Sequence, residues 1–370
     1  MRIDSKVFKN VISIADKIIK SCPSSHILPV KLEAEKGFLR ISATNLGETF
    51  IKTIPVISKE EFCVCVKISD LKKVGKTIKK EFDLTYETEG DYPMLVFKEK
   101  NVVKIVADSD VEEHFPNPEY MSGEISDSKK VGIPFYKEDV FFELIQKICF
   151  STTTKNINSS YAGILFDSEH NNIVSSDIYR LSVVDMKDLE IPMEIVVPAE
   201  FLSFMIKKKS GEFNEMLCSS DHTLFRFSDE TWICNNIKPE FPNYMSVVGN
   251  DFDKVEPLVI DRHYFEDRMK DMAGLFGKDI TAVTTFGNDS ISFQARDKDG
   301  TEMTSEIPFV NPMNPEVRRG YMIQYLLEGI KSFDVNPVEI VFGVEKLQPL
   351  VLKERKNDYV YLHMIMPCRI

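Results

Sequence analysis

The chain has 370 residues, of which 43% are hydrophobic and 28% charged, and its formal net charge is −12. This composition excludes a disordered protein and provides for two or three cores of about 100 to 150 residues each. The sequence has no apolar run near the roughly 18 residues of a membrane span and no apolar stretch of a signal peptide at its start. We therefore expect a cytoplasmic protein without a membrane partner, whose seven scattered cysteines are reduced thiols.

Six segments predict helices, and the first two are rich in lysine. Residues 6–20 place an apolar stripe on one side of a helical wheel and four lysines on the other. Residues 67–80, which Ser69 or Asp70 would cap, place five lysines opposite their apolar face. The other predicted helices are 137–147, 200–209, 261–270 and 316–331.

Taken together the predicted helices are basic, although the whole chain is acidic. Their net charges of +3, +5, −1, +2, 0 and +1 total +10, which leaves −22 for the other 294 residues. For any single helix, a solvated lysine-rich face is the simpler interpretation. If the basic helices share one surface, that surface attracts a polyanion while the acidic remainder repels it. The partner that we expect is double-stranded DNA, held through its phosphates without readout of base sequence.

The same order of helices and strands recurs three times along the chain. Phe115-Pro116-Asn117 returns 126 residues later as Phe241-Pro242-Asn243, each time before an apparent change of domain. Strand-like residues 39–45, 173–177 and 291–295 occupy matching places, as do helical segments around Leu71, Leu202 and Leu326. This period exceeds that of solenoid repeats, so the sequence predicts three similar globular domains in a row, at 1–123, 124–252 and 253–370.

Signatures of catalysis are absent from the sequence. It contains no G-x-x-x-x-G-K-[ST] loop, no G-x-S-x-G, no H-E-x-x-H and no G-x-G-x-x-G between a strand and a helix. The six histidines stand apart, and Cys63 and Cys65 have no nearby residues to complete a metal site. We therefore expect a protein that is not an enzyme and has no catalytic residues, metal or cofactor. A hydrolase or transferase with repeated α+β domains is the alternative from another class, and turnover would reveal it.

Several motifs stand in a particular order along the whole chain. An apolar last strand ends in Met366-Pro367-Cys368-Arg369-Ile370, and residues 176–181 read Ser-Asp-Ile-Tyr-Arg-Leu. Residues 26–29, 113–116 and 240–244 add His-Ile-Leu-Pro, Glu-His-Phe-Pro and Glu-Phe-Pro-Asn-Tyr. In order and spacing these motifs resemble those of bacterial DNA polymerase sliding clamps, the beta subunit of DNA polymerase III.

The resemblance implies an α+β fold of three clamp domains, each with two helices packed on curved antiparallel sheets. Two chains would form a homodimeric ring, head to tail, with contacts around 72–108 of one chain and 268–306 of the other. The ring would encircle DNA and tether the replicative DNA polymerase, which makes the chain a non-catalytic processivity factor. Further implied partners are an ATP-dependent clamp loader, the 3′–5′ exonuclease of the polymerase complex, and repair proteins with clamp-binding peptides.

Two groups of residues carry these expectations. The DNA-facing set is Lys9, Lys17, Lys20, Lys72, Lys73, Lys76, Lys79, Lys80, Lys207, Lys208 and Lys209. The resemblance also implies a peptide-binding cleft between the second and third domains, in which an apolar slot takes Leu and Phe anchors and exposed backbone with Arg180 orients a polar residue. Its set is Tyr161, Ser176, Ile178, Tyr179, Arg180, Leu181, Pro242, Val247, Tyr325, Leu347, Pro349, Met364, Met366, Pro367, Cys368 and Arg369.

Three residues of the cleft depart from the family pattern. Ile178 and Tyr179 replace the usual Gly and His, and Cys368 replaces a common Met or Val. The bulk of Ile178 beside Tyr179 would narrow the slot or change which peptides enter it. An alternative interpretation is therefore a divergent clamp paralogue with restricted partners, serving repair or a mobile element rather than the main replication fork.

Overall fold

The computed structural model describes residues 1–21, 28–58, 60–90, 92–116, 125, 127–153, 159–238, 240–248, 256–309, 317–342 and 348–370. Within these residues, three successive parts of the chain contain the same elements in the same order: one strand, a helix, four strands, a helix and three strands. The predicted α+β class with three repeats, each with two helices and antiparallel sheets, is confirmed. The predicted domain ends at 123/124 and 252/253 lie outside the described residues.

The first repeat comprises β1 (Arg2–Ile3), α1 (Ser5–Lys20), β2 (Val30–Glu35), β3 (Phe38–Thr44), β4 (Glu48–Pro55), β5 (Phe62–Val66), α2 (Ile68–Thr77), β6 (Phe82–Glu89), β7 (Tyr92–Lys98) and β8 (Val102–Val106). The second comprises β9 (Lys129–Lys130), α4 (Glu138–Ile148), β10 (Gly163–Asp167), β11 (Asn172–Ser176), β12 (Arg180–Met186), β13 (Ile195–Pro198), α5 (Ala199–Lys208), β14 (Phe213–Cys218), β15 (His222–Phe227) and β16 (Glu230–Asn235).

The third repeat comprises β17 (Leu258–Ile260), α7 (Arg262–Phe276), β18 (Thr281–Phe286), β19 (Ser290–Arg296), β20 (Glu302–Pro308), β21 (Val317–Met322), α8 (Ile323–Lys331), β22 (Val338–Phe342), β23 (Leu350–Arg355) and β24 (Tyr359–Ile365). Short helical pieces are α3 (Val111–His114), η2 (Phe135–Lys137), η3 (Cys149–Ser151), η4 (Ser160–Ala162) and α6 (Met245–Val248). The matched strands of the sequence are β3, β11 and β19, the third strand of each repeat.

The chain folds into two compact units that do not follow the repeats. Unit 1 contains residues 1–131 and 204–236, and unit 2 contains residues 132–203 and 237–370. Unit 1 holds the sheets β5-β2-β3-β4-β16-β15-β14-β9 and β1-β6-β7-β8. Unit 2 holds the sheets β13-β10-β11-β12-β24-β23-β22-β17 and β20-β19-β18-β21. Each eight-stranded sheet thus joins two repeats, through β4 and β16 in unit 1 and through β12 and β24 in unit 2.

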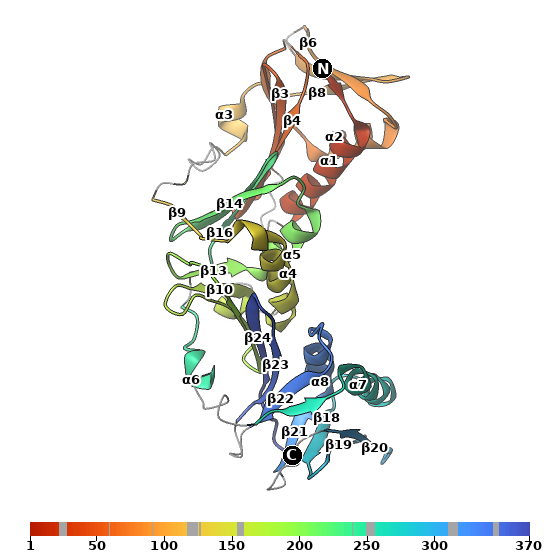
Figure 1. The fold of residues 1–370 in the computed structure, drawn as a ribbon. Helices are drawn as coiled ribbons and strands as arrows, with labels where there is room; N and C mark the ends of the chain where they lie inside the picture. The colour runs from red at the N-terminus through yellow and green to blue at the C-terminus, as the bar shows by residue number, and fades with distance from the viewer. Residues whose placement is uncertain are drawn as a thin grey trace. The chain divides into compact units, whose positions relative to one another are not determined.

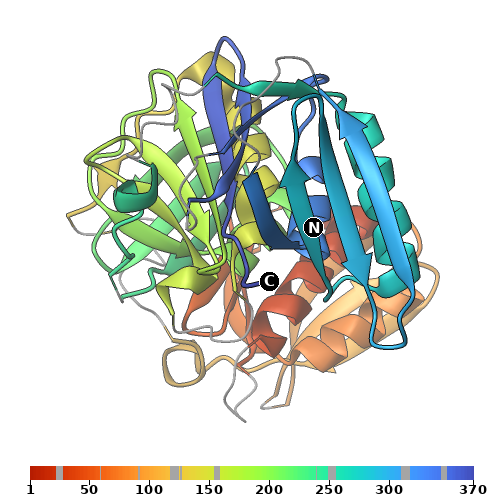
Figure 2. The same cartoon turned by 90° about the horizontal axis from the view of Figure 1, so that it is seen from below.

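The helices cover one face of these sheets. In unit 1, α1 lies against β3 and β4 with α2 beside it (Figure 1). In unit 2, α7 runs alongside the sheet that contains β18, β19 and β20 (Figure 2). The Asp4 carboxylate caps α1 by accepting the N–H groups of Lys6 (2.7 Å) and Val7 (3.1 Å). Buried side chains from Phe8 to Ile19 form the apolar stripe of α1 that the sequence predicted.

Three helix predictions need correction. The second helix ends at Thr77 rather than residue 80, and its N-cap is Lys67 without a side-chain bond, so neither Ser69 nor Asp70 caps it. Residues 317–322 form strand β21, because they pair along β18, and α8 begins only at Ile323. The α7 helix continues to Phe276, beyond the predicted residue 270. With these bounds the helices carry +3, +2, −2, +1, 0 and 0, a total of +4, so charge is less segregated than predicted.

Candidate functional site

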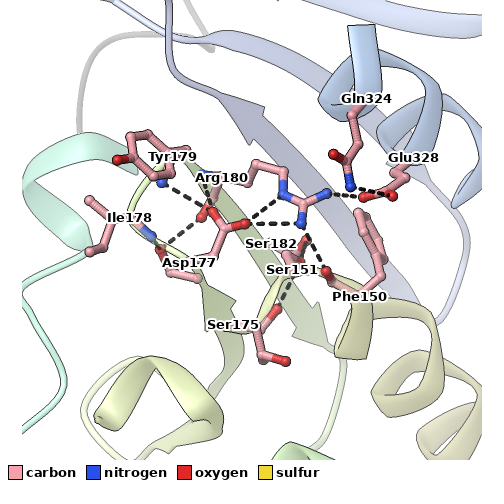
Figure 3. Close-up of polar contacts among 12 residues, drawn as sticks. Phe150, Ser151, Ser175, Asp177, Ile178, Tyr179, Arg180, Ser182, Gln324 and Glu328 are labelled. Atoms are coloured by element: carbon pink, nitrogen blue, oxygen red, sulfur yellow. Dashed lines mark hydrogen bonds and ion pairs between the residues drawn. The ribbon is translucent and has the colours of Figure 1, made fainter. Parts of the chain in front are cut away.

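The turn between β11 and β12 is held together by its own polar groups (Figure 3). The Ser176 hydroxyl donates to the carbonyl of Arg180 (2.7 Å) and accepts the N–H of Ile178 (3.1 Å). Asp177 Oδ1 accepts the N–H groups of Tyr179 (3.1 Å) and Arg180 (2.9 Å). The turn gives Ile178 a φ of 82°, which β-branched residues rarely adopt. It also leaves the Ile178 and Tyr179 side chains 62% and 58% exposed.

Arg180 is buried beneath this turn, with its side chain 5% exposed. Its Nε–H donates to the Asp177 carboxylate (3.0 Å), an Nη2–H donates to the Phe150 carbonyl (3.0 Å), and Nη1 pairs with Glu328. The guanidinium carbon lies 4.5 Å from the centre of the Tyr325 ring. These bonds fix the turn to η3 and α8. A contact between Arg180 and a polar residue of a bound peptide stays a prediction.

A hydrophobic cluster extends from the turn across both halves of the eight-stranded sheet of unit 2. Its buried members are Leu165, Val174, Leu181, Val183, Val196, Tyr244, Val341, Val351 and Met364. Partly buried side chains border it, namely Ile237, Phe241, Met245, Val247, Val248 and Leu362. We call these fifteen residues the apolar site. Apolar side chains at the border between core and solvent can accept the anchor residues of a short peptide.

Several of the predicted peptide-site residues lie in the apolar site or in contact with it. Leu181 and Met364 belong to it and face each other across β12 and β24, and Val247 packs at its border. The Tyr161 ring lies 5.9 Å from the ring of Phe241, a border residue. Of the remaining predicted residues, Pro242 is exposed, Pro349 is buried, and Leu347 lies outside the described residues.

The chain end completes this surface. The Met366 N–H donates to the Tyr179 carbonyl (2.9 Å), which attaches the C-terminal segment to the turn. The Cys368 N–H donates to the Gly320 carbonyl (2.8 Å) in β21. Tyr179 stacks on Tyr325, with ring centres 6.2 Å apart and planes at 21°. Among the other predicted residues, Pro367 is half-buried and Arg369 is exposed.

Sequence reasoning missed a buried polar chain beneath the site. Burial, and then the positive charge of Arg180, lower the pKa of His363 to about 3, so the imidazole is neutral. His363 Nδ1 lies 2.9 Å from the Ser182 hydroxyl, which lies 2.6 Å from that of Ser151. Ser151 in turn donates to the Ile148 carbonyl (3.0 Å). Ser182 and His363 are 181 positions apart in sequence, and the pairing of β12 with β24 brings them together.

The equivalent turn of the first repeat provides an internal comparison. Between β3 and β4, the Thr44 hydroxyl donates to the Glu48 carbonyl (3.0 Å), Asn45 Oδ1 accepts two N–H groups, and Leu46 has a φ of 74°. The backbone of the turn is therefore repeated. The side chains behind it are not, because Ser42 and Thr49 occupy the places of Val174 and Leu181. These two apolar side chains of the unit 2 turn are therefore not repeated at the turn of unit 1.

The predicted DNA-facing lysines belong to unit 1. Lys9, Lys17 and Lys20 are exposed on α1, and Lys73 and Lys76 are exposed on α2. The exception on these helices is Lys72, which is half-buried and donates to the Asp16 carboxylate (2.8 Å), as Lys20 also does (2.9 Å). Lys79 and Lys80 are exposed and lie in the connection between α2 and β6. Near the end of α5, Lys207 and Lys208 are exposed and Lys209 is half-buried.

Asp16 joins the two lysine-rich helices. Burial alone would raise the pKa of Asp16, but the bonds from Lys72 and Lys20 hold it below its ordinary value. Asp16 is therefore ionised at neutral pH and neutralises part of the lysine charge. Contact of any of these lysines with DNA stays a prediction.

Comparisons with known proteins identify the fold. No protein-family model and no curated protein matches the sequence. Solved structures match the whole chain: the DNA polymerase sliding clamp from Bacillus subtilis has a TM-score of 0.84 at 14% identity, with 100% of this chain and 98% of that chain covered. The chain has the sliding-clamp fold. The clamp from Caulobacter crescentus gives 0.83 at 17%, and the DNA polymerase beta subunit of Streptococcus pyogenes gives 0.82 at 15%, each covering 100% of this chain and 99% of the other.

Other features of this sliding-clamp fold bear on its chemistry. Within the described residues, no group of three or more His, Cys, Asp or Glu side chains is placed to hold a metal ion. None of the described helices has the length and apolar character needed to cross a membrane. Among the described cysteines, Cys63, Cys65, Cys218, Cys234 and Cys368 are free thiols, and burial raises the pKa of Cys65 to about 12.

Proposed function

We propose that the chain is a non-catalytic DNA sliding clamp, which encircles duplex DNA as a head-to-tail homodimer and tethers the replicative polymerase. The three repeats would be its three clamp domains, and the cytoplasm its location. Full-length similarity to solved sliding clamps supports the fold on which this proposal depends. The proposal is carried further by a strand pairing between repeats, which occurs twice within the chain. The strands that would form it a third time, one in the first repeat and one in the third, are unpaired edge strands among the described residues.

The repeated pairing joins the fourth strand of one repeat to the last strand of the next. In unit 1 the fourth strand of the first repeat, β4, pairs with β16, and in unit 2 the fourth strand of the second repeat, β12, pairs with β24. The third repeat offers β20 in the same place, and the first offers β8, and both are edge strands among the described residues. Their unpaired backbone groups favour addition of another strand. A second copy of the chain would supply both partners and close the ring.

The register of that pairing follows from the repeats. Asp177 N–H bonds to the Arg180 carbonyl, and Asp297 N–H bonds to the Thr301 carbonyl, so Glu302 corresponds to Leu181. Asp108 forms an isolated bridge with Cys65 in β5, and Cys368 forms one with Gly320 in the matching strand β21 of the third repeat. Asp108 and Cys368 are therefore equivalent, and so are Lys104 and Met364, which lie four residues before them.

Leu181 pairs with Met364, so Glu302 of one chain would lie opposite Lys104 of the other, and Met303 opposite Val103. The opposite charges of Glu302 and Lys104 favour this register.

The lysines and the apolar site support the two remaining parts of the proposal. Exposed lysines on α1 and α2 suit loose contact with phosphates, which allows a ring to slide because no base is read. The apolar site suits peptides with leucine and phenylalanine anchors, so the polymerase, the clamp loader and repair proteins would compete for it. The exposed Ile178 and Tyr179 favour a second candidate function, a divergent clamp with restricted partners. Competition between polymerase and repair peptides for binding to the purified protein would distinguish the replicative clamp from a divergent clamp with restricted partners.

The experiment that tests ring closure is disulfide trapping with Met303→Cys and Val103→Cys in one chain. Residues directly opposite in an antiparallel pair have Cα atoms about 4.5–5.5 Å apart, within the roughly 4.4–6.8 Å that a disulfide spans. We expect covalent dimers after mild oxidation, and the trapped ring should stay on nicked circular DNA after loading but slide off linear DNA. Each single cysteine variant is the control for the native thiols. A protein that stays monomeric at micromolar concentration, or that binds both DNA forms equally, would refute the clamp.

A further inference from the structure

One edge of the apolar site is formed by residues 241–248, which include α6. Four of the partly buried border side chains, Phe241, Met245, Val247 and Val248, come from this segment. The N–H groups of Val247 and Val248 bond to the carbonyl of Tyr244 (2.9 and 3.1 Å). The short helix is therefore built directly onto Tyr244. What holds Tyr244 in place also holds this border.

Tyr244 is fixed by polar groups on the neighbouring hairpin. Its ring belongs to the buried cluster and is 8% exposed. Its hydroxyl donates to the Asp167 carboxylate (2.5 Å) at the end of β10 and accepts Asn172 Nδ2–H (3.0 Å) at the start of β11. The His170 ring lies edge-on to the Tyr244 ring, with centres 6.3 Å apart. One side chain thus ties the segment to β10 and β11.

Asp167 is a strong acceptor for this bond. Its side chain is 5% exposed, and its other contacts are His170 Nδ1 (2.8 Å) and the Glu169 N–H (2.8 Å). Burial alone would raise the pKa of Asp167, but the bonds from Tyr244 and His170 hold it below its ordinary value. The carboxylate is therefore ionised at neutral pH, and a hydrogen bond to an ionised acceptor is stronger than one between neutral groups.

We propose that Tyr244 is a positioning residue for peptide binding, whose bond to Asp167 holds α6 in place as an ordered border of the apolar site. The inference rests on the proposed function, in which this site receives partner peptides. A border that is already ordered spares the bound state the entropy of fixing it, which raises affinity without a new contact. Loss of the hydroxyl leaves the apolar ring in the cluster and removes only the tether.

The test is Tyr244→Phe, with Tyr361→Phe as its matched control. Tyr361 is also buried in unit 2 and its hydroxyl lies 2.8 Å from that of Ser332, but it has no place in the apolar site. The probe is a fluorescein-labelled pentapeptide with glutamine first and leucine and phenylalanine last, followed by fluorescence anisotropy. We expect Tyr244→Phe to bind about tenfold more weakly, as the loss of one hydrogen bond to a charged group predicts. Tyr361→Phe should bind within about twofold of the wild type, although both variants lose a buried hydrogen bond.

Hydrogen exchange supplies a second readout that a general loss of stability would not give. Faster exchange of the Val247 and Val248 amides in Tyr244→Phe, with β12 amides unchanged, supports the tether. Asp167→Asn, which keeps an acceptor, should weaken binding less than Tyr244→Phe. A wild type that does not bind the probe overturns the peptide function and the role of Tyr244 together. Binding by the wild type and equal binding by Tyr244→Phe overturns the positioning role alone.

Discussion

Lys52 is a buried charge at the junction of the first and second repeats, and its replacement by methionine should destabilise unit 1. Its side chain is 7% exposed and its ammonium group lies 2.7 Å from Asp229 and 3.0 Å from Glu230, which is 1% exposed. In Lys52→Met the aliphatic part of the side chain is kept, but Glu230 loses its closest positive charge. Breaking a buried ion pair on one side costs about 3–5 kcal/mol.

The lower end of this range applies to Lys52→Met. Glu230 keeps the Ser210 hydroxyl (2.5 Å), the Ser210 N–H (3.0 Å) and Trp232 Nε1–H (3.1 Å) as donors. We therefore expect a loss of about 3 kcal/mol in the free energy of unfolding of unit 1. With a urea dependence of about 2–3 kcal/mol per molar, the unfolding midpoint should fall by about 1–1.5 M.

The assay is tryptophan fluorescence during urea unfolding. Trp232 is the single tryptophan of the chain, is fully buried in unit 1, and packs against Phe50 with ring centres 4.6 Å apart. Lys36→Met is the matched control, because Lys36 is 82% exposed and pairs only loosely with Glu61 at 3.9 Å. It should shift the free energy of unfolding by less than about 0.5 kcal/mol.

A second variant tests the stated cause. Adding Glu230→Gln to Lys52→Met removes the uncompensated charge and should restore about half of the lost stability. The reasoning is refuted if Lys52→Met costs less than about 1 kcal/mol, or if the double variant is less stable than the single one.

Three further predictions concern unit 2. Burial would raise the pKa of Glu354, but bonds from Tyr359 and Lys147 hold this pKa below 4.5. The stability that ionised Glu354 contributes is present above pH 4.5 and is lost as the pH falls through the lower pKa of the folded state. Glu354→Gln should therefore reduce the loss of stability in acid, measured by circular dichroism. Ile178→Gly should raise the free energy of unfolding by about 1 kcal/mol, since release of a strained φ exceeds the entropy cost of glycine; no gain in a melting experiment would contradict this. Gly329→Ala should lower the free energy of unfolding by about 1–3 kcal/mol, because the new Cβ would lie 2.8 Å from His363 Cδ2. Gly274→Ala, which has open space around its Cβ, should be neutral or stabilising in the same melting experiment.

The elements that sequence reasoning predicted well are those with a local signal. The apolar stripe and lysine face of α1 repeat at helical spacing, and the turn at Ser176 to Leu181 is closed by side chains within five residues of one another. Both are visible in a single stretch of sequence. The predicted helix 316–331 was wrong over residues 317–322, because Val317 and its neighbours alternate too little to separate strand from helix. Pairing with β18 makes this segment a strand.

The parts that could not be predicted depend on contacts between distant residues. Arg180 meets Glu328 148 positions away, and Ser182 meets His363 181 positions away. No spacing rule connects such pairs, so their burial and their partners follow only from the tertiary fold. The same holds for Tyr244, whose hydroxyl finds Asp167 77 positions away.

The division of the second repeat between two units has a consequence for biosynthesis. Strand β4 ends at Pro55, but its neighbour β16 begins only at Glu230. At a ribosomal rate of about 5–20 residues per second, roughly 10–35 s separate the two. During that time the open edge of β4 exposes unpaired backbone groups to other nascent chains. Expression of this protein should therefore depend on chaperones that bind extended segments, and slow synthesis should increase its aggregation.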